Sequence, residues 1–299
     1  MKMRMIKQAA TIGLVILMSG LLIHAVPEET KKQITGEGTA RYFPVAVDFA
    51  GESAPLSITD VRERFDRELL VNANLDATTL LIIKRANRYF PIIEPILARN
   101  GVPDDFKYLA VIESGLVHAT SPAGARGIWQ FMPDTARGYG MEVNEVVDER
   151  YHLEKATEAA CRYLLDSKKK FGSWTLAAAA YNGGNNGVGR QIEMQKVTDY
   201  YDLHLTEETA RYVFRILALK EIMKNPQLYG FTIAPEELYE NLPVRKVEVD
   251  STINDLASFA KNEGINYKIL KIHNPWLRDK KLLNNSRKKY VIDIPTKGY

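Results

Sequence analysis

Glu113 is the side chain whose type and position in this sequence best suit acid–base chemistry. The start Val102-Pro103-Asp104-Asp105 predicts a helix on which Phe106, Leu109 and Ala110 form an apolar stripe, and Glu113 falls on that stripe in the last turn. Burial and the negative end of the helix dipole would both raise the pKa of this carboxyl. A carboxyl that is protonated near neutral pH can act as a general acid. The spacing alone also allows a carboxylate at the edge of the stripe that reaches into water.

The sequence gives little support for a disulfide, a metal site or a nucleotide-binding site. The single cysteine, Cys161, excludes an internal disulfide and a multi-cysteine metal site, and no two histidines are four residues apart as on a zinc-binding helix. The glycine-rich run 183–189 lacks the Lys-Ser/Thr of a phosphate loop and follows a helical pattern, so we expect a mobile loop there. We therefore predict no metal, cofactor or nucleotide, and the net charge of +3 gives no support for nucleic acid as a partner.

The elements that must position Glu113 are predicted to be helices. The chain has 299 residues, 45% of them hydrophobic and 26% charged, which is enough for one large core and a small one. Few segments before Asn241 alternate as strands do, so residues 57–240 are predicted to form a mainly α domain. Pro91 and Pro95 are expected to begin a new helix after one that ends near Phe90. Apolar positions at helical spacing are Val61, Phe65, Leu69, Leu153, Ala156, Ala160, Leu164, Ala210, Val213, Phe214 and Leu217.

Residues 243–299 have a different pattern, which predicts a small α+β module. Two strand-like segments, 245–249 and 289–294, enclose two helical segments at 252–263 and 267–273 in the order β-α-α-β. From Pro243 onward there are 12 Lys and Arg against 6 Asp and Glu, a net charge of +6. The rest of the chain therefore carries 28 basic and 31 acidic residues, a net charge of −3.

The amino terminus has the layout of an export signal. Lys2, Arg4 and Lys7 precede an uncharged apolar run over 9–23, which is typical of a signal peptide over residues 1–25. Ile23 is bulky where a small residue is usual, so an uncleaved membrane anchor is the alternative. Residues 26–56 are expected to be a linker. We therefore expect an exported protein of the periplasm or cell envelope.

Four short motifs follow one another along the helical domain. They are Glu113-Ser114, Gly127-Ile128-Trp129-Gln130-Phe131-Met132, Ala180-Tyr181-Asn182 and Glu208-Thr209-x-x-Tyr212-Val213. This set resembles the lytic transglycosylases of glycoside hydrolase family 23 over about residues 103–229. Four ordered motifs are far more specific than any one of them. The resemblance implies a lysozyme-like helical domain of the goose-type and soluble lytic transglycosylase kind.

The resemblance also implies a role for each motif residue. Glu113 would be the catalytic residue, first as acid and then as base. Gln130 and the backbone around it would line a sugar groove, and Tyr212 would face the acid. The residues expected to bind substrate are Ser121, Trp129, Gln130, Met132, Tyr181, Asn182 and Tyr212.

The implied reaction cleaves the glycan strands of peptidoglycan with one carboxylate. Glu113 would protonate the oxygen between N-acetylmuramic acid and N-acetylglucosamine, the acetamido group of the substrate would support the anomeric carbon, and Glu113 would then accept the proton of the C6 hydroxyl. The product would be a 1,6-anhydromuramic end, formed without water. A hydrolytic muramidase and a non-catalytic cell-wall binding protein are the alternatives.

The C-terminal module resembles a divergent LysM domain. The matching segments are 247–253, 256–257, 270–274 and 291–295, with Asp250-Ser251-Thr252-Ile253 where LysM domains usually have Gly-Asp-Thr-Leu. The resemblance implies glycan binding. A basic solvated surface without a ligand, and a surface for an anionic wall polymer or a membrane, are the other interpretations.

Overall fold

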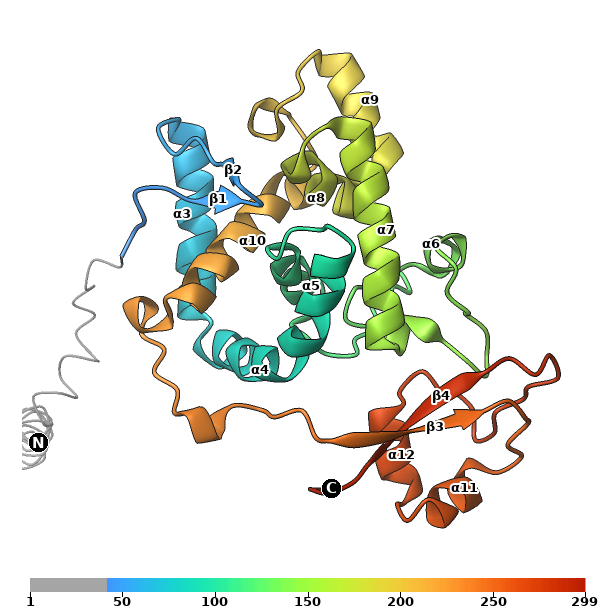
Figure 1. The fold of residues 1–299 in the computed structure, drawn as a ribbon. Helices are drawn as coiled ribbons and strands as arrows, with labels where there is room; N and C mark the ends of the chain where they lie inside the picture. The colour runs from blue at the N-terminus through green and yellow to red at the C-terminus, as the bar shows by residue number, and fades with distance from the viewer. Residues whose placement is uncertain (1–41, 299) are drawn as a thin grey trace, which may run out of the picture. The chain divides into compact units, whose positions relative to one another are not determined.

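The helix that carries Glu113 lies at the centre of a helical domain. The computed structural model describes residues 42–298. In it α5 (Phe106–Ser114) packs against α4 and α10, and Figure 1 shows the surrounding helices. The other α-helices of this domain are α3 (Thr59–Asn74), α4 (Asp76–Arg99), α6 (Pro133–Gly138), α7 (Leu153–Phe171), α8 (Trp174–Gly183), α9 (Asn185–Gln195) and α10 (Glu207–Lys224). The predicted mainly α fold is confirmed.

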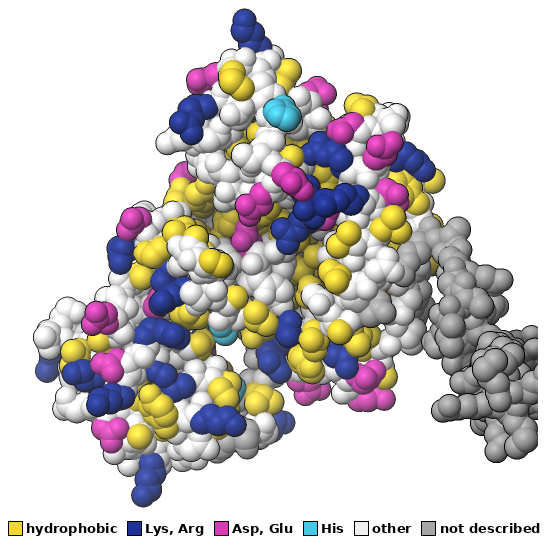
Figure 2. Space-filling view, turned by 180° about the vertical axis from the view of Figure 1, so that it is seen from behind, with side chains coloured by type: hydrophobic (Ala, Val, Ile, Leu, Met, Phe, Trp, Pro, Cys, Tyr) yellow, Lys and Arg dark blue, Asp and Glu magenta, His cyan; other side chains and the backbone are white. Residues whose placement is uncertain are grey.

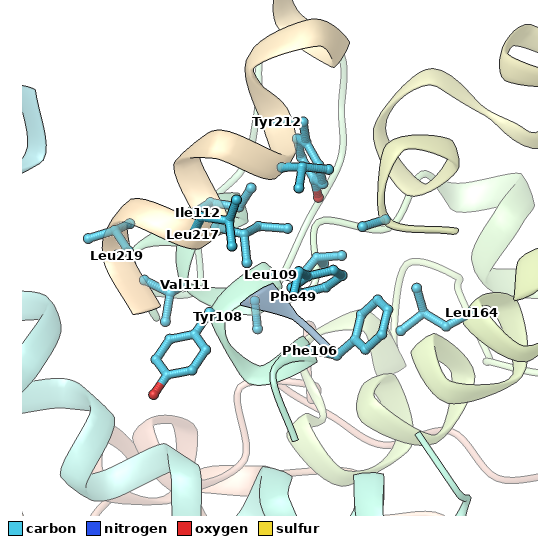
Figure 3. Packing of buried hydrophobic residues seen from close by; sticks show 14 of the residues in the cluster. Phe49, Phe106, Tyr108, Leu109, Val111, Ile112, Leu164, Tyr212, Leu217 and Leu219 are labelled. Atoms are coloured by element: carbon cyan, nitrogen blue, oxygen red, sulfur yellow. The ribbon is translucent and has the colours of Figure 1, made fainter. Parts of the chain in front are cut away.

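The apolar side chains of α5 are covered by neighbouring elements. Phe106 and Leu109 are fully buried, and the ring of Phe106 lies edge-on against Phe49 with the centroids 4.9 Å apart (Figure 3). The helix ends at Gly115, whose φ of 59° is the left-handed conformation that commonly terminates helices. Glu113 therefore lies in the last turn, as the sequence predicts.

The α4 helix is continuous, so the predicted break at Pro91 was wrong. Both Pro91 and Pro95 lie inside the helix, which ends at Arg99. Each proline removes one backbone donor. Ile93 and Leu97 are completely buried, and we attribute the continuity of the helix to the packing of this face, which offsets the lost hydrogen bonds.

Part of the predicted linker 26–56 packs on the helical domain. A short hairpin of β1 (Asp48–Phe49) and β2 (Glu52–Ser53) places Phe49 in the main core. The carboxylate of Glu52 accepts hydrogen bonds from the backbone N–H groups of Trp174, at 2.7 Å, and Thr175, at 2.8 Å. Although burial opposes the change, hydrogen bonds from Thr175, Trp174 and Ser173 lower the pKa of Glu52 to about 2. Glu52 thus caps the first turn of α8, a helix that reaches the candidate site.

The predicted β-α-α-β module is confirmed. It consists of β3 (Val244–Val249), α11 (Leu256–Asn262), α12 (Tyr267–His273) and β4 (Tyr290–Pro295). The two strands pair antiparallel with Val247 opposite Ile292. Leu256, Leu270 and Ile292 are completely buried in a second hydrophobic cluster, separate from the core around α5. Figure 2 shows many Lys and Arg side chains over the surface of this module.

Within residues 42–298, no helix is long and apolar enough to cross a membrane. The predicted signal peptide or anchor over 1–25 and the first part of the predicted linker lie outside the described residues.

Candidate active site

The side chain of Glu113 is held by a tyrosine from a distant helix. The Tyr212 hydroxyl, on α10, donates a hydrogen bond to Oε1 of Glu113. Tyr212 is buried and projects from α10 (Figure 3). Glu113 itself is only half-buried. The carboxyl is thus fixed on one side while part of the side chain remains accessible.

The environment of Glu113 favours its protonated form. Burial raises the pKa of Glu113 to about 7, although the hydrogen bond from Tyr212 and the positive charge of Arg215 oppose the increase. The negative charge of Glu208 adds to the increase. At neutral pH a large fraction of Glu113 therefore carries a proton that it can donate.

Two charged residues near Glu113 had no assigned role in the sequence analysis. Arg215 lies one helical turn after Tyr212 and donates from Nη2 to the backbone oxygen of Ile112, at 3.2 Å. Glu208 lies about one turn before Tyr212. Both line a cavity of about 380 Å³ together with Glu207 and Arg211. The signal that could have found them is their spacing of three and four residues from Tyr212 on one helix.

The loop before α6 is attached to the residue next to Glu113. The Ser114 hydroxyl donates to the backbone oxygen of Ile128, at 2.8 Å. Gln130 has a φ of 50°, and its side-chain amide donates to the backbone oxygens of Gly127, at 2.7 Å, and Ala119, at 3.2 Å. The Gln130 amide therefore closes its own loop, and its role toward a sugar stays a prediction.

The other residues of this loop differ in accessibility. The Trp129 side chain is 0% exposed and donates from Nε1 to Thr157 Oγ1 at 2.8 Å, so only its backbone can contribute to a groove. Met132 is 42% exposed and precedes α6, where it can contact a ligand. Ser121 accepts a hydrogen bond from the backbone of Ala125, at 3.0 Å, and so closes a turn. Within residues 42–298, no hydrogen bond joins Ser121 to Glu113.

The third motif ties α8 to its neighbours. The Tyr181 hydroxyl donates to the backbone oxygen of Trp129, at 2.8 Å. The side-chain amide of Asn182 accepts from Thr209 Oγ1, at 2.7 Å, and donates to Glu208 Oε1, at 3.1 Å. These bonds connect α8 with the loop on one side and with the start of α10 on the other. Tyr181 is half-buried, so part of it remains available to a ligand.

The run 183–189 was predicted to be a mobile loop, and this prediction was wrong. Gly183 is the last residue of α8, Gly184 has a φ of 74°, and Asn185 begins α9. The glycine with positive φ allows the chain to turn sharply between two helices. A phosphate loop would require a strand before the turn, and here a helix precedes it.

The arrangement can perform general acid chemistry with one carboxyl group. A neutral Glu113 supplies the proton, and Tyr212 stabilises the carboxylate that remains after the proton has left. Within the described residues, no group of three His, Cys, Asp or Glu side chains is placed to hold a metal ion.

Replacing Tyr212 with Phe should change the pH dependence of the reaction. An acid catalyst must be protonated, so kcat/KM of the unmodified protein should fall as the pH rises above about 7. The Tyr212 hydrogen bond lowers the pKa of Glu113, so its removal raises that pKa. The pH at which kcat/KM falls should therefore rise by about one unit, and kcat should decrease roughly tenfold. A pH profile measured from pH 5 to 9 tests this, and an unchanged or downward shift would contradict it.

Comparison with known protein families identifies two parts of the chain. Residues 90–203 match the transglycosylase SLT domain. Residues 245–298 match the soluble lytic transglycosylase C-terminal LysM-like domain. The first match contains Glu113 and the second and third motifs, and the second match covers most of the β-α-α-β module.

Two curated relatives and one solved structure are similar to parts of this chain. Membrane-bound lytic murein transglycosylase D of Escherichia coli K12 is 32% identical over 258 residues, which are 83% of this chain and 55% of the relative. The putative tributyltin chloride resistance protein of Alteromonas sp. M-1 is 30% identical over 110 residues, 36% of this chain and 53% of the relative. The chain thus spans about half the length of these relatives. An inactive mutant of lytic transglycosylase Slt from Pseudomonas aeruginosa aligns with 50% of this chain and 26% of its own, with a TM-score of 0.36 and 19% identity.

Proposed function

Since the chain carries a transglycosylase SLT domain and a LysM-like C-terminal domain of the soluble lytic transglycosylase type, we propose that it is a peptidoglycan lytic transglycosylase. The observation that carries this proposal is the carboxyl of Glu113, with a pKa of about 7 and a hydrogen bond from Tyr212. The printed name of the 32% identical relative, a lytic murein transglycosylase, supports the same substrate class.

The reaction begins with proton donation by Glu113. The neutral carboxyl protonates the oxygen that links N-acetylmuramic acid to N-acetylglucosamine, and the bond from the anomeric carbon to this oxygen breaks. The acetamido group of the substrate supports the positive charge that develops on the anomeric carbon. Tyr212 stabilises the carboxylate form of Glu113 during this step.

The second half of the reaction returns the proton to Glu113. The carboxylate accepts the proton of the C6 hydroxyl, and the C6 oxygen bonds to the anomeric carbon. A 1,6-anhydro ring forms and no water is consumed. The second carboxylate of ordinary glycosidases, which serves as nucleophile or base, is not needed for this route.

The products of purified sacculi test the proposal. We expect muropeptides with 1,6-anhydromuramic ends, which are lighter by one water than the reducing ends that hydrolysis leaves. Mass analysis of the soluble products distinguishes the two. Reducing ends alone would identify a hydrolytic muramidase, and binding without soluble products would identify a non-catalytic cell-wall protein; either result would contradict the proposal.

We also propose that the protein is exported and acts in the cell envelope. The basic flank and apolar run at residues 1–25 support export, and the printed name of the relative, membrane-bound, supports an envelope location. The glycan strands of peptidoglycan are the proposed partner, and the N-terminal segment is the proposed membrane attachment. In the proposed domain arrangement, residues 57–240 perform the reaction and 243–299 form the LysM-like module.

A further inference from the structure

The C-terminal module joins the helical domain through the segment 142–151. The backbone N–H of Asp148 donates to the oxygen of Trp276, at 2.9 Å, and the N–H of Arg278 donates to the oxygen of Val146, at 2.8 Å. Val147 lies between these bonds, opposite Leu277, and is buried in the hydrophobic cluster of the module. The segment 142–151 is therefore part of the helical domain in sequence, but it packs against the hydrophobic cluster of the module.

Side chains of the module reinforce this contact. The Tyr290 hydroxyl donates to Oε2 of Glu142, at 2.9 Å. Lys288 Nζ donates to Oε2 of Glu142, at 2.6 Å, and to Oε1 of Glu149, at 3.1 Å. The Glu149 side chain is only 3% exposed, so this ion pair is protected from solvent on one side. Part of the basic charge of the module is thus used to hold the segment 142–151.

The seam between the two parts combines packed contacts with a cavity. A cavity of about 540 Å³ lies at another place in the seam, lined by Tyr89 and His118 of the helical domain and by Ile272 and Trp276 of the module. Beside this cavity, Val147 and Tyr151 are buried in the hydrophobic cluster of the module, and the ring of His152 stacks on Trp276.

Arg150 extends the contact from this segment to the loop of the candidate site. Its side chain is 3% exposed, and the guanidinium donates to both carboxylate oxygens of Asp148, at 2.9 and 2.8 Å. Nη1 of Arg150 also donates to the backbone oxygens of Gly124, at 3.0 Å, and Phe131, at 3.1 Å. One side chain thus holds both ends of the loop 124–131.

That loop is the one attached to the catalytic helix. Its Ile128 oxygen accepts from Ser114, the neighbour of Glu113, and its Trp129 oxygen accepts from Tyr181. A continuous series of contacts therefore runs from the module through Asp148 and Arg150 to the residues around Glu113. A small displacement of a reacting group can reduce turnover strongly, even when the cause is distant.

We propose that the C-terminal module positions the active site as well as attaching the enzyme to the wall. In this role Arg150 is a positioning residue that transmits the contact of the module to the loop 124–131. The inference rests on the proposed function, because it concerns the turnover of that same site. A module that served only as a wall anchor would affect the binding of sacculi and leave the turnover of a small substrate unchanged.

A short soluble substrate separates the two roles. We would measure kcat and KM on a muramyl tetrasaccharide, and binding to purified sacculi, for the double variant Tyr290→Phe/Lys288→Gln. The double variant Tyr267→Phe/Lys268→Gln is the matched control, since both residues are exposed on α12 of the same module. We expect roughly a tenfold lower kcat on the tetrasaccharide for the first variant, with little change in KM, and no change for the control.

Arg150→Gln and Arg150→Lys provide a second comparison. Lys keeps a positive charge beside Asp148, so Arg150→Lys should recover part of the kcat that Arg150→Gln loses. If Arg150→Gln does not fold, the decision rests on the Tyr290→Phe/Lys288→Gln variant, whose changes lie in the module. A folded variant of that kind with unchanged kcat on the tetrasaccharide would overturn the inference.

Hydrogen exchange gives a readout that does not depend on activity. The amides of residues 124–131 should exchange faster in the Tyr290→Phe/Lys288→Gln variant than in the unmodified protein and the control. If the unmodified protein releases no anhydro products, the proposed function fails, while the exchange measurement still tests the positioning role. Equal exchange rates in all three proteins would overturn that role.

Discussion

Glu113→Gln is expected to abolish the release of anhydro-ended muropeptides from purified sacculi. Glutamine has nearly the same shape and can still bond to Tyr212, but it can neither donate a proton to the glycosidic oxygen nor accept one from the C6 hydroxyl. General acid–base catalysis contributes about 10²–10⁴-fold to a rate. Because one side chain serves in both steps, we expect kcat to fall by at least about 10³-fold.

The measurement is the mass analysis of soluble products, together with a sacculus-binding assay. Binding should be retained, because the substitution removes no contact of the module. Glu63→Gln is the matched control, since it makes the same chemical change at an exposed position on α3. Product release by Glu113→Gln at a rate near that of this control would refute the role of Glu113.

Gly127→Ala is expected to destabilise the protein strongly, although it adds only one methyl group. Gly127 has a φ of 81°, and a Cβ built there would lie 1.9 Å from the backbone oxygen of Arg150. The left-handed conformation costs about 1–2 kcal/mol for a residue with a Cβ, and the steric overlap adds about 1–3 kcal/mol. The free energy of unfolding should therefore fall by about 2–5 kcal/mol, which lowers Tm by roughly 10 °C.

A neighbouring glycine provides the control for this prediction. Gly124 lies in the same loop with a φ of 90°, but a Cβ there would meet no atom within 4 Å. Gly124→Ala therefore carries only the conformational cost. Thermal unfolding of both variants separates the two contributions, and equal losses of stability would show that the close approach of Gly127 to Arg150 does not matter.

The apolar face of the catalytic helix and the place of Glu113 on it could be predicted from its residues. The spacing of Phe106 and Leu109 placed Glu113 on an apolar stripe in the last turn, and the helix does end directly afterwards, at Ser114. Both features depend on residues within two turns of one another. The continuity of α4 through Pro91 could not be predicted, because the cost of a proline is local while the burial of Ile93 and Leu97 depends on other helices.

The residues of the candidate site could be predicted more fully than the contacts that they make. The motifs indicated Tyr212 as a neighbour of Glu113, and the two side chains are bonded although 99 positions separate them. They did not indicate that the Gln130 amide bonds within its own loop or that the Trp129 ring is buried. Arg215 and Glu208, which act on the pKa of Glu113, had no assigned role because their influence depends on distance in space.

The sequence by itself determined the helical character of the large domain, the β-α-α-β order of the module and the identity of the candidate acid. The first two follow from periodicity, which is a property of nearby residues, and the third is implied by four ordered motifs that resemble those of a known family. Only the tertiary structure decided that Glu52 caps α8 from 123 positions away, and that Arg150 connects the module to the loop beside Glu113. The physical reason is that such contacts form when distant segments pack together, and no local pattern specifies which buried donor will meet which acceptor.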